Sequence, residues 1–340
     1  MSTLTSSHQK RSLKRSYIVI SFSAIFIAVL VVITTLSAAA QPHQAAAPQA
    51  GGSFKFTAAG DYGQNNYTTA NLKYIAQSGA SFDLALGDFN YNPSVSDAQW
   101  SAYAKGLLPA NFPFEILFGD HDGSGGKTYT TNFPNRMANM SGTYAKQYYF
   151  DYPASSPLAR FIMISPDGDS KGSSGYNWVA NAITSARSAN IHWIIVGMYN
   201  YCFTLDQSCN NQDLLDLLLN MHVDLILQAH KHSYQASKQL ALNANCKSLS
   251  TTYNSQCVVN SSTSMTRGAG SVIVVTGTGG ATPQISINPK ESQMGYFRTW
   301  AAANKNETWG ISQFTVSATQ ISMRFVNTTG SFTDSFTING

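Results

Sequence analysis

Charged residues are scarce in this sequence of 340 residues, at 11% of the chain against a usual value of about 25%. The formal net charge of +4 arises from an N-terminal head that carries four cations and no acidic residue: Lys10, Arg11, Lys14 and Arg15. The remainder is balanced at 17 basic and 17 acidic residues and contains no basic run. The sequence therefore lacks the electrostatic footprint of a nucleic-acid-binding protein, and a small substrate fits it better.

Cysteine is also rare, and its spacing excludes the common zinc sites. The four cysteines are Cys202, Cys209, Cys246 and Cys257, none in a Cys-x-x-Cys pair. An even count favours disulfides in an oxidising compartment, and we expect the two local pairs, Cys202 with Cys209 and Cys246 with Cys257. Three pairings are possible, and free buried thiols are the alternative. The absence of an internal repeat and the 12% aromatic content indicate an ordinary globular chain.

The N-terminal head has the pattern of an export signal. Residues 17–36 are apolar and follow the four cations, and Ser37-Ala38-Ala39-Ala40 precedes Gln41. We expect residues 1–40 to be a signal peptide cleaved after Ala40, or else an uncleaved membrane anchor, because the apolar stretch is close to the ~20 residues that span a bilayer. Either interpretation places the protein in a secreted or extracytoplasmic location, with that anchor as its only membrane contact. Residues 41–52, rich in Ala, Pro and Gln, are a linker, and residues 53–340 form one domain.

Alternating short apolar runs and amphipathic segments in the domain predict mixed α and β structure. The expected strands are residues 54–59, 82–86, 114–118, 161–165, 193–197, 225–228 and 272–276. The expected helices are residues 68–77, 98–105, 176–188 and 212–220. Residues 121–148 and 233–270 are expected to be long loops, and residues 311–338 an antiparallel meander.

Three of the expected strands end in Gly-Asp. The segments are Ala59-Gly60-Asp61, Leu86-Gly87-Asp88 and Phe118-Gly119-Asp120, and another strand ends in Ala229-His230-Lys231-His232. Ligands bind at the carboxyl edge of such sheets, where side chains far apart in sequence converge. Three carboxylates and two imidazoles would remain unpaired there without a cation, so the pattern predicts a pair of metal ions with Asp88 as the bridging ligand.

These motifs resemble those of the calcineurin-like metallophosphoesterases in order and spacing. Gly-Asp-x-x-Tyr, which ends at Tyr91, resembles the purple acid phosphatase branch. The resemblance implies an α+β fold, a four-layer sandwich of two mixed β-sheets flanked by helices. It further implies a dinuclear-metal phosphoesterase that hydrolyses small phosphate esters.

Site residues follow from the resemblance position by position. One ion, commonly ferric in the family, would be held by Asp61, Asp88, Tyr91 and His232. The second ion, iron, manganese or zinc, would be held by Asp88, Asp120 and His230. His121 matches the residue that contacts the phosphoryl group or the leaving oxygen, and Asp122 is placed to orient it.

Two departures from the family pattern affect the second ion. The family has Asn where Asp120 stands, and the motif Val-x-x-His is met by Val196-Gly197-Met198-Tyr199. Tyr199 is then either a phenolate ligand of an oxygen-rich site, or the second ion is weak, different or absent. The alternative function is a catalytically impaired relative that binds a phosphorylated ligand or a single metal ion.

Overall fold

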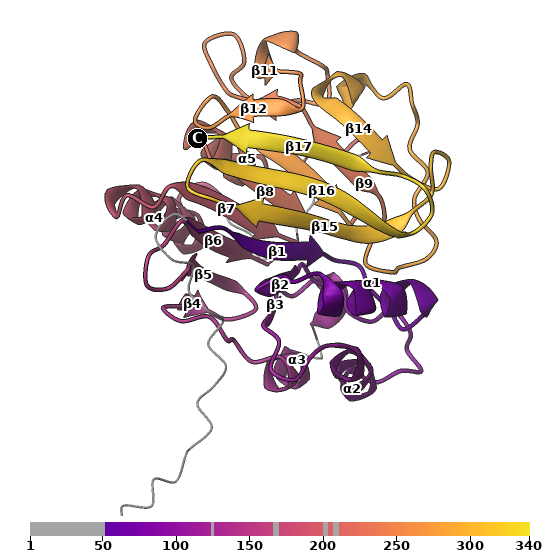
Figure 1. Cartoon of the computed structure of the whole chain (residues 1–340). Coiled ribbons are helices and arrows are strands. Elements are labelled where there is room, and N and C mark those ends of the chain that lie inside the picture. The colour runs from indigo at the N-terminus through magenta and orange to yellow at the C-terminus, as the bar shows by residue number, and fades with distance from the viewer. Residues whose placement is uncertain (1–51, 124–125, 166–169, 200–202, 207–210) are drawn as a thin grey trace, which may run out of the picture. The chain divides into compact units, whose positions relative to one another are not determined.

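The computed structural model describes residues 52–123, 126–165, 170–199, 203–206 and 211–340. All of them belong to one compact unit, His43–Gly340. Most of its strands form two large sheets (Figure 1). The disulfide Cys246–Cys257 is confirmed, whereas Cys202 and Cys209 lie outside the described residues.

The first sheet has seven strands in the order β12-β17-β16-β15-β1-β2-β3. They are β1 (Phe54–Ala59), β2 (Phe82–Ala85), β3 (Phe114–Ile116), β12 (Ser264–Thr266), β15 (Trp309–Val316), β16 (Gln320–Thr329) and β17 (Asp334–Asn339). Strands β1, β2 and β3 are parallel to one another, and β15 to β17 form the expected antiparallel meander.

The second sheet has eight strands in the order β14-β9-β13-β8-β7-β6-β5-β4. They are β4 (Ser141–Thr143), β5 (Gln147–Tyr152), β6 (Ala159–Ile164), β7 (Trp193–Met198), β8 (Leu225–Gln228), β9 (Tyr234–Ser237), β13 (Val272–Thr276) and β14 (Phe297–Ala301). Its four central strands, β6, β7, β8 and β13, run parallel. They are rich in branched apolar residues and buried throughout, as central strands covered on both faces are.

In the described residues, five α-helices cover the outer faces of the sheets and complete four layers. They are α1 (Asn66–Gln77), α2 (Asp97–Leu107), α3 (Gly126–Asn132), α4 (Ser174–Ser188) and α5 (Gln212–Asn220). Leu72 of α1 and Trp100 of α2 pack on the first sheet, and α4 and α5 pack on the second. Between the sheets, the ring of Phe56 stacks on Phe82 and on Phe314, with centroids 5.5 Å and 4.6 Å apart. The predicted α+β four-layer sandwich is confirmed.

Two expectations are corrected. The segments expected to be long loops contain α3, β4 and β9, and also a small sheet of β10 (Gln239–Leu240) and β11 (Val258–Asn260). No helix in the described ranges is long and apolar enough to cross a membrane, so the structure does not support the expected anchor. Residues 17–36 lie outside those ranges, and the secreted or extracytoplasmic location inferred from them is withdrawn.

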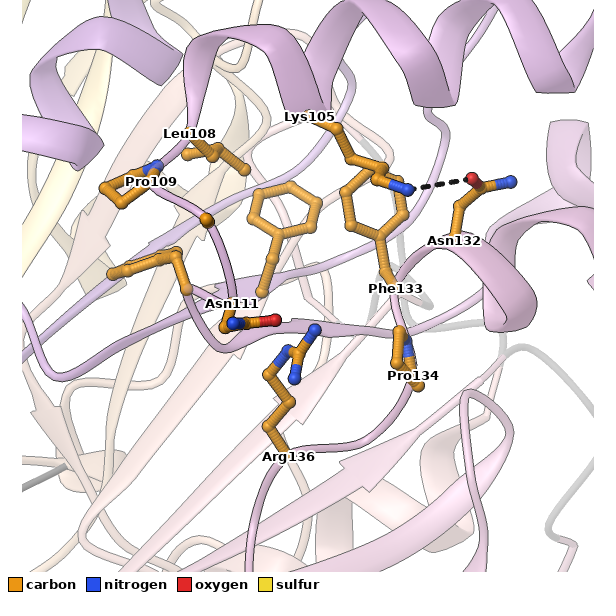
Figure 2. Close-up of a pocket in the computed structure, with 11 residues that line it drawn as sticks. Lys105, Leu108, Pro109, Asn111, Asn132, Phe133, Pro134 and Arg136 are labelled. Atoms are coloured by element: carbon orange, nitrogen blue, oxygen red, sulfur yellow. Dashed lines mark hydrogen bonds between the residues drawn. The ribbon is translucent and has the colours of Figure 1, made fainter. Parts of the chain in front are cut away.

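One hollow lies at the amino end of β3, away from the strand ends that carry the Gly-Asp motifs (Figure 2). It is about 400 Å³ in volume, including the open solvent at its mouth. Lys105 and Arg136 border it beside the rings of Phe112 and Phe133, and Lys105 Nζ donates a hydrogen bond to Asn132. Both cationic side chains are exposed, so nothing encloses a ligand there.

A buried carboxyl group on β3 should make stability fall as pH rises. Glu115 is fully buried, its Oε1 accepts a hydrogen bond from Arg136 N, and its Oε2 has no partner. Burial raises the pKa of Glu115 to about 8, well above its value of about 4.3 in an unfolded chain. The folded protein therefore holds a proton that the unfolded chain releases between these two pH values, and stability declines across that window.

Replacing Glu115 with Gln should remove this dependence. The free energy of unfolding of the variant minus that of the wild type should be larger at pH 9 than at pH 5, by on the order of a few kcal/mol. Urea unfolding at both pH values measures the gain. Glu307→Gln, at an exposed position, is the control and should show none. An equal difference between Glu115→Gln and wild type at both pH values would contradict the pKa assignment.

Candidate metal centre

Polar side chains from both sheets meet at one edge of the unit, which we call the polar edge. Asp61, Asp88 and Asp120 follow the adjacent parallel strands β1, β2 and β3 of the first sheet. Tyr199 follows β7, and His230 and His232 follow β8, which are neighbouring parallel strands of the second sheet. Hydrogen bonds of Tyr199 and Tyr91 connect the two groups, so the structure brings these predicted residues together.

The backbone at this edge is tightly constrained. Asp61, Asp88 and His230 have φ values of 60°, 53° and 71°, in the left-handed region that non-glycine residues rarely adopt. The loops after β2 and β3 also touch, because a Cβ on Gly87 would lie 2.7 Å from Gly119 N. The glycine before Asp88 is therefore required by the close approach of two backbones.

One half of the centre is built around Tyr91. Its hydroxyl lies 2.8 Å from Asp61 Oδ1, 2.8 Å from Asp88 Oδ2 and 3.1 Å from His232 Nε2. His232 Nδ1 lies 3.1 Å from the carbonyl oxygen of Pro283. A carbonyl can only accept, so Nδ1 carries the hydrogen, and the Nε2 lone pair faces the site.

The other half is built around Tyr199, which is 2% exposed. Its hydroxyl lies 2.7 Å from Asp88 Oδ2 and 2.7 Å from His230 Nδ1, and it donates to Asp120. His230 Nδ1 is 3.6 Å from Asp120 Oδ1. The two tyrosine hydroxyls thus meet on one carboxylate oxygen, Asp88 Oδ2.

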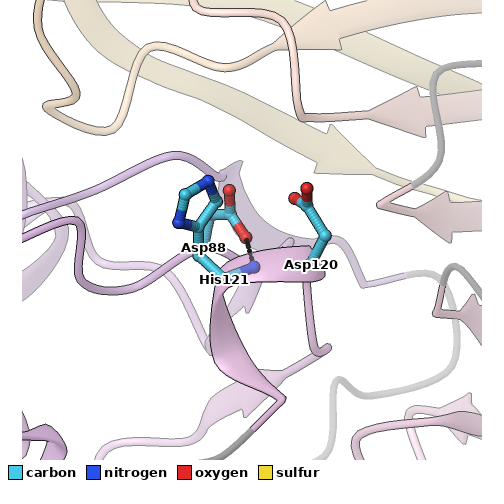
Figure 3. Close-up of side chains that lie close together, drawn as sticks. All are labelled: Asp88, Asp120 and His121. Atoms are coloured by element: carbon cyan, nitrogen blue, oxygen red, sulfur yellow. Dashed lines mark hydrogen bonds between the residues drawn. The ribbon is translucent and has the colours of Figure 1, made fainter.

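His121 extends to the same side as Asp88 and Asp120 (Figure 3). One ligand atom from each of these three side chains lies within 4.8 Å of the others, close enough to hold a metal ion together. His121 N also donates to Asp88 Oδ1 at 3.0 Å, and the rings of His121 and Tyr91 are 4.7 Å apart at their centroids. His121, which is expected to contact the substrate, therefore lies beside both halves of the centre, through its contacts with Asp88 and Tyr91.

Asp122 does not occupy the position expected of a residue that orients His121. It is buried, and both of its carboxylate oxygens accept hydrogen bonds from backbone N–H groups. The donors belong to Asp88, Phe89 and Gly119. The expected orienting role is corrected accordingly, because the carboxylate faces the backbone of the ligand loops.

The electrostatics of the centre favour a bound cation. Burial, together with the charge of Asp88, raises the pKa of Asp61 well above its usual range, and burial also raises the pKa of Asp88. Asp61 Oδ2 is buried and has no hydrogen-bond partner. Burial lowers the pKa values of His230 and His232, which favours the neutral imidazole that a metal requires. Carboxylate, phenol and imidazole donors around an orphaned buried oxygen fit a metal ion.

Sequence reasoning missed the loop that supports Asp61. Ala281 N donates to the carbonyl oxygen of Asp61 at 2.8 Å, and Gly279 N donates to that of Gly60 at 2.9 Å. A Cβ on Gly277 would lie 2.5 Å from Asp61 Oδ2. The cluster of glycines directly after β13 was the available signal, since such clusters mark close backbone approach.

The four-layer sandwich is the fold expected from the predicted resemblance, and the comparisons with known phosphatases confirm that resemblance. No protein-family model matches the chain. Over 220 residues it is 21% identical to purple acid phosphatase 23 of Arabidopsis thaliana, covering 53% of this chain and 47% of the relative. The chain spans about half the length of the curated relatives it matches.

Solved structures show the same architecture. Purple acid phosphatase PPD1 from yellow lupin (Lupinus luteus) seeds superimposes with a TM-score of 0.62 at 15% identity, over 86% of this chain and 55% of that one. A dimetal phosphatase from Danio rerio superimposes with a TM-score of 0.50 at 10% identity, over 83% of this chain and 99% of that one. The chain therefore has a phosphoesterase-like fold with a candidate metal site at its polar edge.

Proposed function

We propose that the protein is a metal-dependent phosphoric ester hydrolase with two metal ions and a small phosphate ester as substrate. The observation that carries the proposal is the convergence of Asp61, Asp88 and Asp120 with two imidazoles while Asp61 Oδ2 stays buried without a partner. Burying the carboxylates of Asp61 and Asp88 without a cation would cost several kcal/mol. Its likeness in fold to phosphatases supports the same reaction class.

Each half of the centre would hold one ion. Asp61, Asp88, Tyr91 and His232 would bind the first, and Asp88, Asp120, Tyr199 and His230 the second. The hard oxygen donors around Tyr91 suit iron, and the second position suits iron, manganese or zinc. When bound, such ions supply Lewis acidity that neutralises the phosphoryl oxygens during in-line displacement.

His121 would act on the substrate from the open side of the centre. Its side chain is exposed, and its backbone N–H is fixed by Asp88 Oδ1. The imidazole can give a proton to the leaving oxygen or hydrogen-bond to the phosphoryl group.

A second candidate function follows from the position of Tyr199. Its hydroxyl contacts all three residues expected to bind the second ion, Asp88, Asp120 and His230. If this hydroxyl stays protonated, it substitutes for the second ion by hydrogen bonding. The protein would then bind one metal ion or a phosphorylated ligand without efficient hydrolysis.

Metal analysis with a hydrolysis assay distinguishes the two functions. Protein purified without added metal is analysed for iron, manganese and zinc, and its hydrolysis of p-nitrophenyl phosphate is measured. The enzyme requires two ions per chain and metal-dependent turnover, and ferric iron at Tyr91 would add visible absorption. One ion or none, without turnover, would refute the enzyme and support the binding protein.

A further inference from the structure

Asp122 makes three backbone contacts across two loops. Its Oδ2 accepts from Asp88 N at 2.7 Å and from Gly119 N at 2.8 Å, and its Oδ1 accepts from Phe89 N at 3.0 Å. Asp88 and Phe89 follow β2, whereas Gly119 follows β3. One buried carboxylate therefore ties together the two loops that carry Asp88 and Asp120.

The loops need such a tie because ordinary strand pairing has ended there. The register of β2 with β3 stops at Ala85 and Ile116, and beyond it the backbone turns into the left-handed conformation of Asp88. The three N–H groups would be left unpaired in the interior without the carboxylate, at about 1–3 kcal/mol each.

The loops that the Asp122 carboxylate joins are closely packed against each other. A Cβ on Gly119 would lie 2.1 Å from Asp88 Oδ1 and 2.7 Å from Asp88 N. Asp88 Oδ1 also receives the N–H of His121. A small shift of either loop would therefore move the carboxylate that both halves of the centre share.

We propose that Asp122 is a positioning residue that fixes the distance between Asp88 and Asp120 for metal binding. This inference rests on the proposed metal centre. Loss of the Asp122 carboxylate should therefore weaken metal binding. The effect should not depend on the orientation of the His121 ring.

The test uses Asp122→Asn, whose amide can accept from only one side and presents a donor to the remaining N–H groups. Chelator-treated protein is titrated with Mn²⁺ alone. We expect the dissociation constant to rise about 10- to 100-fold, as for other groups that hold metal ligands in place. The matched control is Asp224→Asn, which alters a buried carboxylate that accepts from Ile194 N away from the centre. It should lose thermal stability and keep the wild-type Mn²⁺ affinity.

The outcomes separate this inference from the proposed function. Unchanged Mn²⁺ affinity in Asp122→Asn, with a pH profile of hydrolysis altered as in His121→Ala, would overturn the positioning role. Should the variant not fold, hydrogen exchange in the wild type decides: the amides of Asp88, Phe89 and Gly119 should be protected, and rapid exchange would overturn the inference. A wild type that binds no Mn²⁺ would count against the metal centre, while the exchange measurement would still test the tie.

Discussion

Replacing Asp88 with asparagine should remove bound metal and slow phosphate-ester hydrolysis by roughly 10³-fold or more, the equivalent of several kcal/mol. Asp88 supplies the oxygen that both tyrosine hydroxyls contact, so its loss affects both halves of the centre. Asparagine has nearly the same shape and tolerates the φ of 53° at this position. Metal content per chain and turnover of p-nitrophenyl phosphate measure the effect.

The metal-free form gives a second readout for the same variant. Burial raises the pKa of Asp88, so a neutral amide should make the chelated protein at least as stable as the chelated wild type at neutral pH. Asp97→Asn is the matched control, because Asp97 accepts from Tyr129 in a comparable contact at 2.9 Å. It should keep metal and activity, and loss of metal in both variants would point to general destabilisation.

The double variant Asp120→Asn, Tyr199→His should bind zinc with an affinity roughly tenfold or more above that of the wild type. It should also hydrolyse phosphate esters faster than the wild type. Burial and the charges of Asp61 and Asp88 raise the pKa of Tyr199 far above its usual range, so in the metal-free protein its hydroxyl stays protonated and donates a hydrogen bond. Histidine binds zinc as a neutral imidazole. Asparagine also removes one negative charge beside His230. Zinc content and hydrolysis rate are measured together.

The single variant Tyr199→Phe controls for the ring. The Tyr199 side chain packs against Gly87 and Gly119, and phenylalanine keeps that packing while losing the hydroxyl. If Tyr199 substitutes for the second ion, Tyr199→Phe should raise metal content; if Tyr199 is a ligand, it should lower it. A double variant with unchanged zinc content and rate would show that Tyr199 only lines the site.

The elements that could be predicted from the sequence are those with strong local signals. The bounds of β1, β8, β13 and α5 were predicted at residues 54–59, 225–228, 272–276 and 212–220, because these segments are densely apolar or strongly amphipathic. Helix α3 was missed, since Gly126–Asn132 is polar and its single buried residue is Tyr129. Strand β9 is buried although its sequence, Tyr-Gln-Ala-Ser, is half polar, so its pairing depends on tertiary contacts.

The residues of the site likewise include some that could be predicted from the sequence and others that could not. Gly-Asp and His-x-His after apolar runs identified the side chains that converge, because strand ends share an edge. The partners of Asp122 could not be predicted, since backbone N–H groups leave no mark in the sequence. The support of Asp61 by Gly277 also depends on how close two loops lie, which residue types alone do not fix.

The polar edge takes Asp61, Asp88 and Asp120 from one sheet and Tyr199, His230 and His232 from the other. Neither sheet alone contains a complete set of groups for either half of the centre. During folding, high-affinity metal binding would therefore have to follow the packing of the two sheets against each other, which requires contacts between distant parts of the chain. A newly made chain that has not extended past β8 would hold at most a partial site, so metal acquisition would mark the end of folding and could report on its completion.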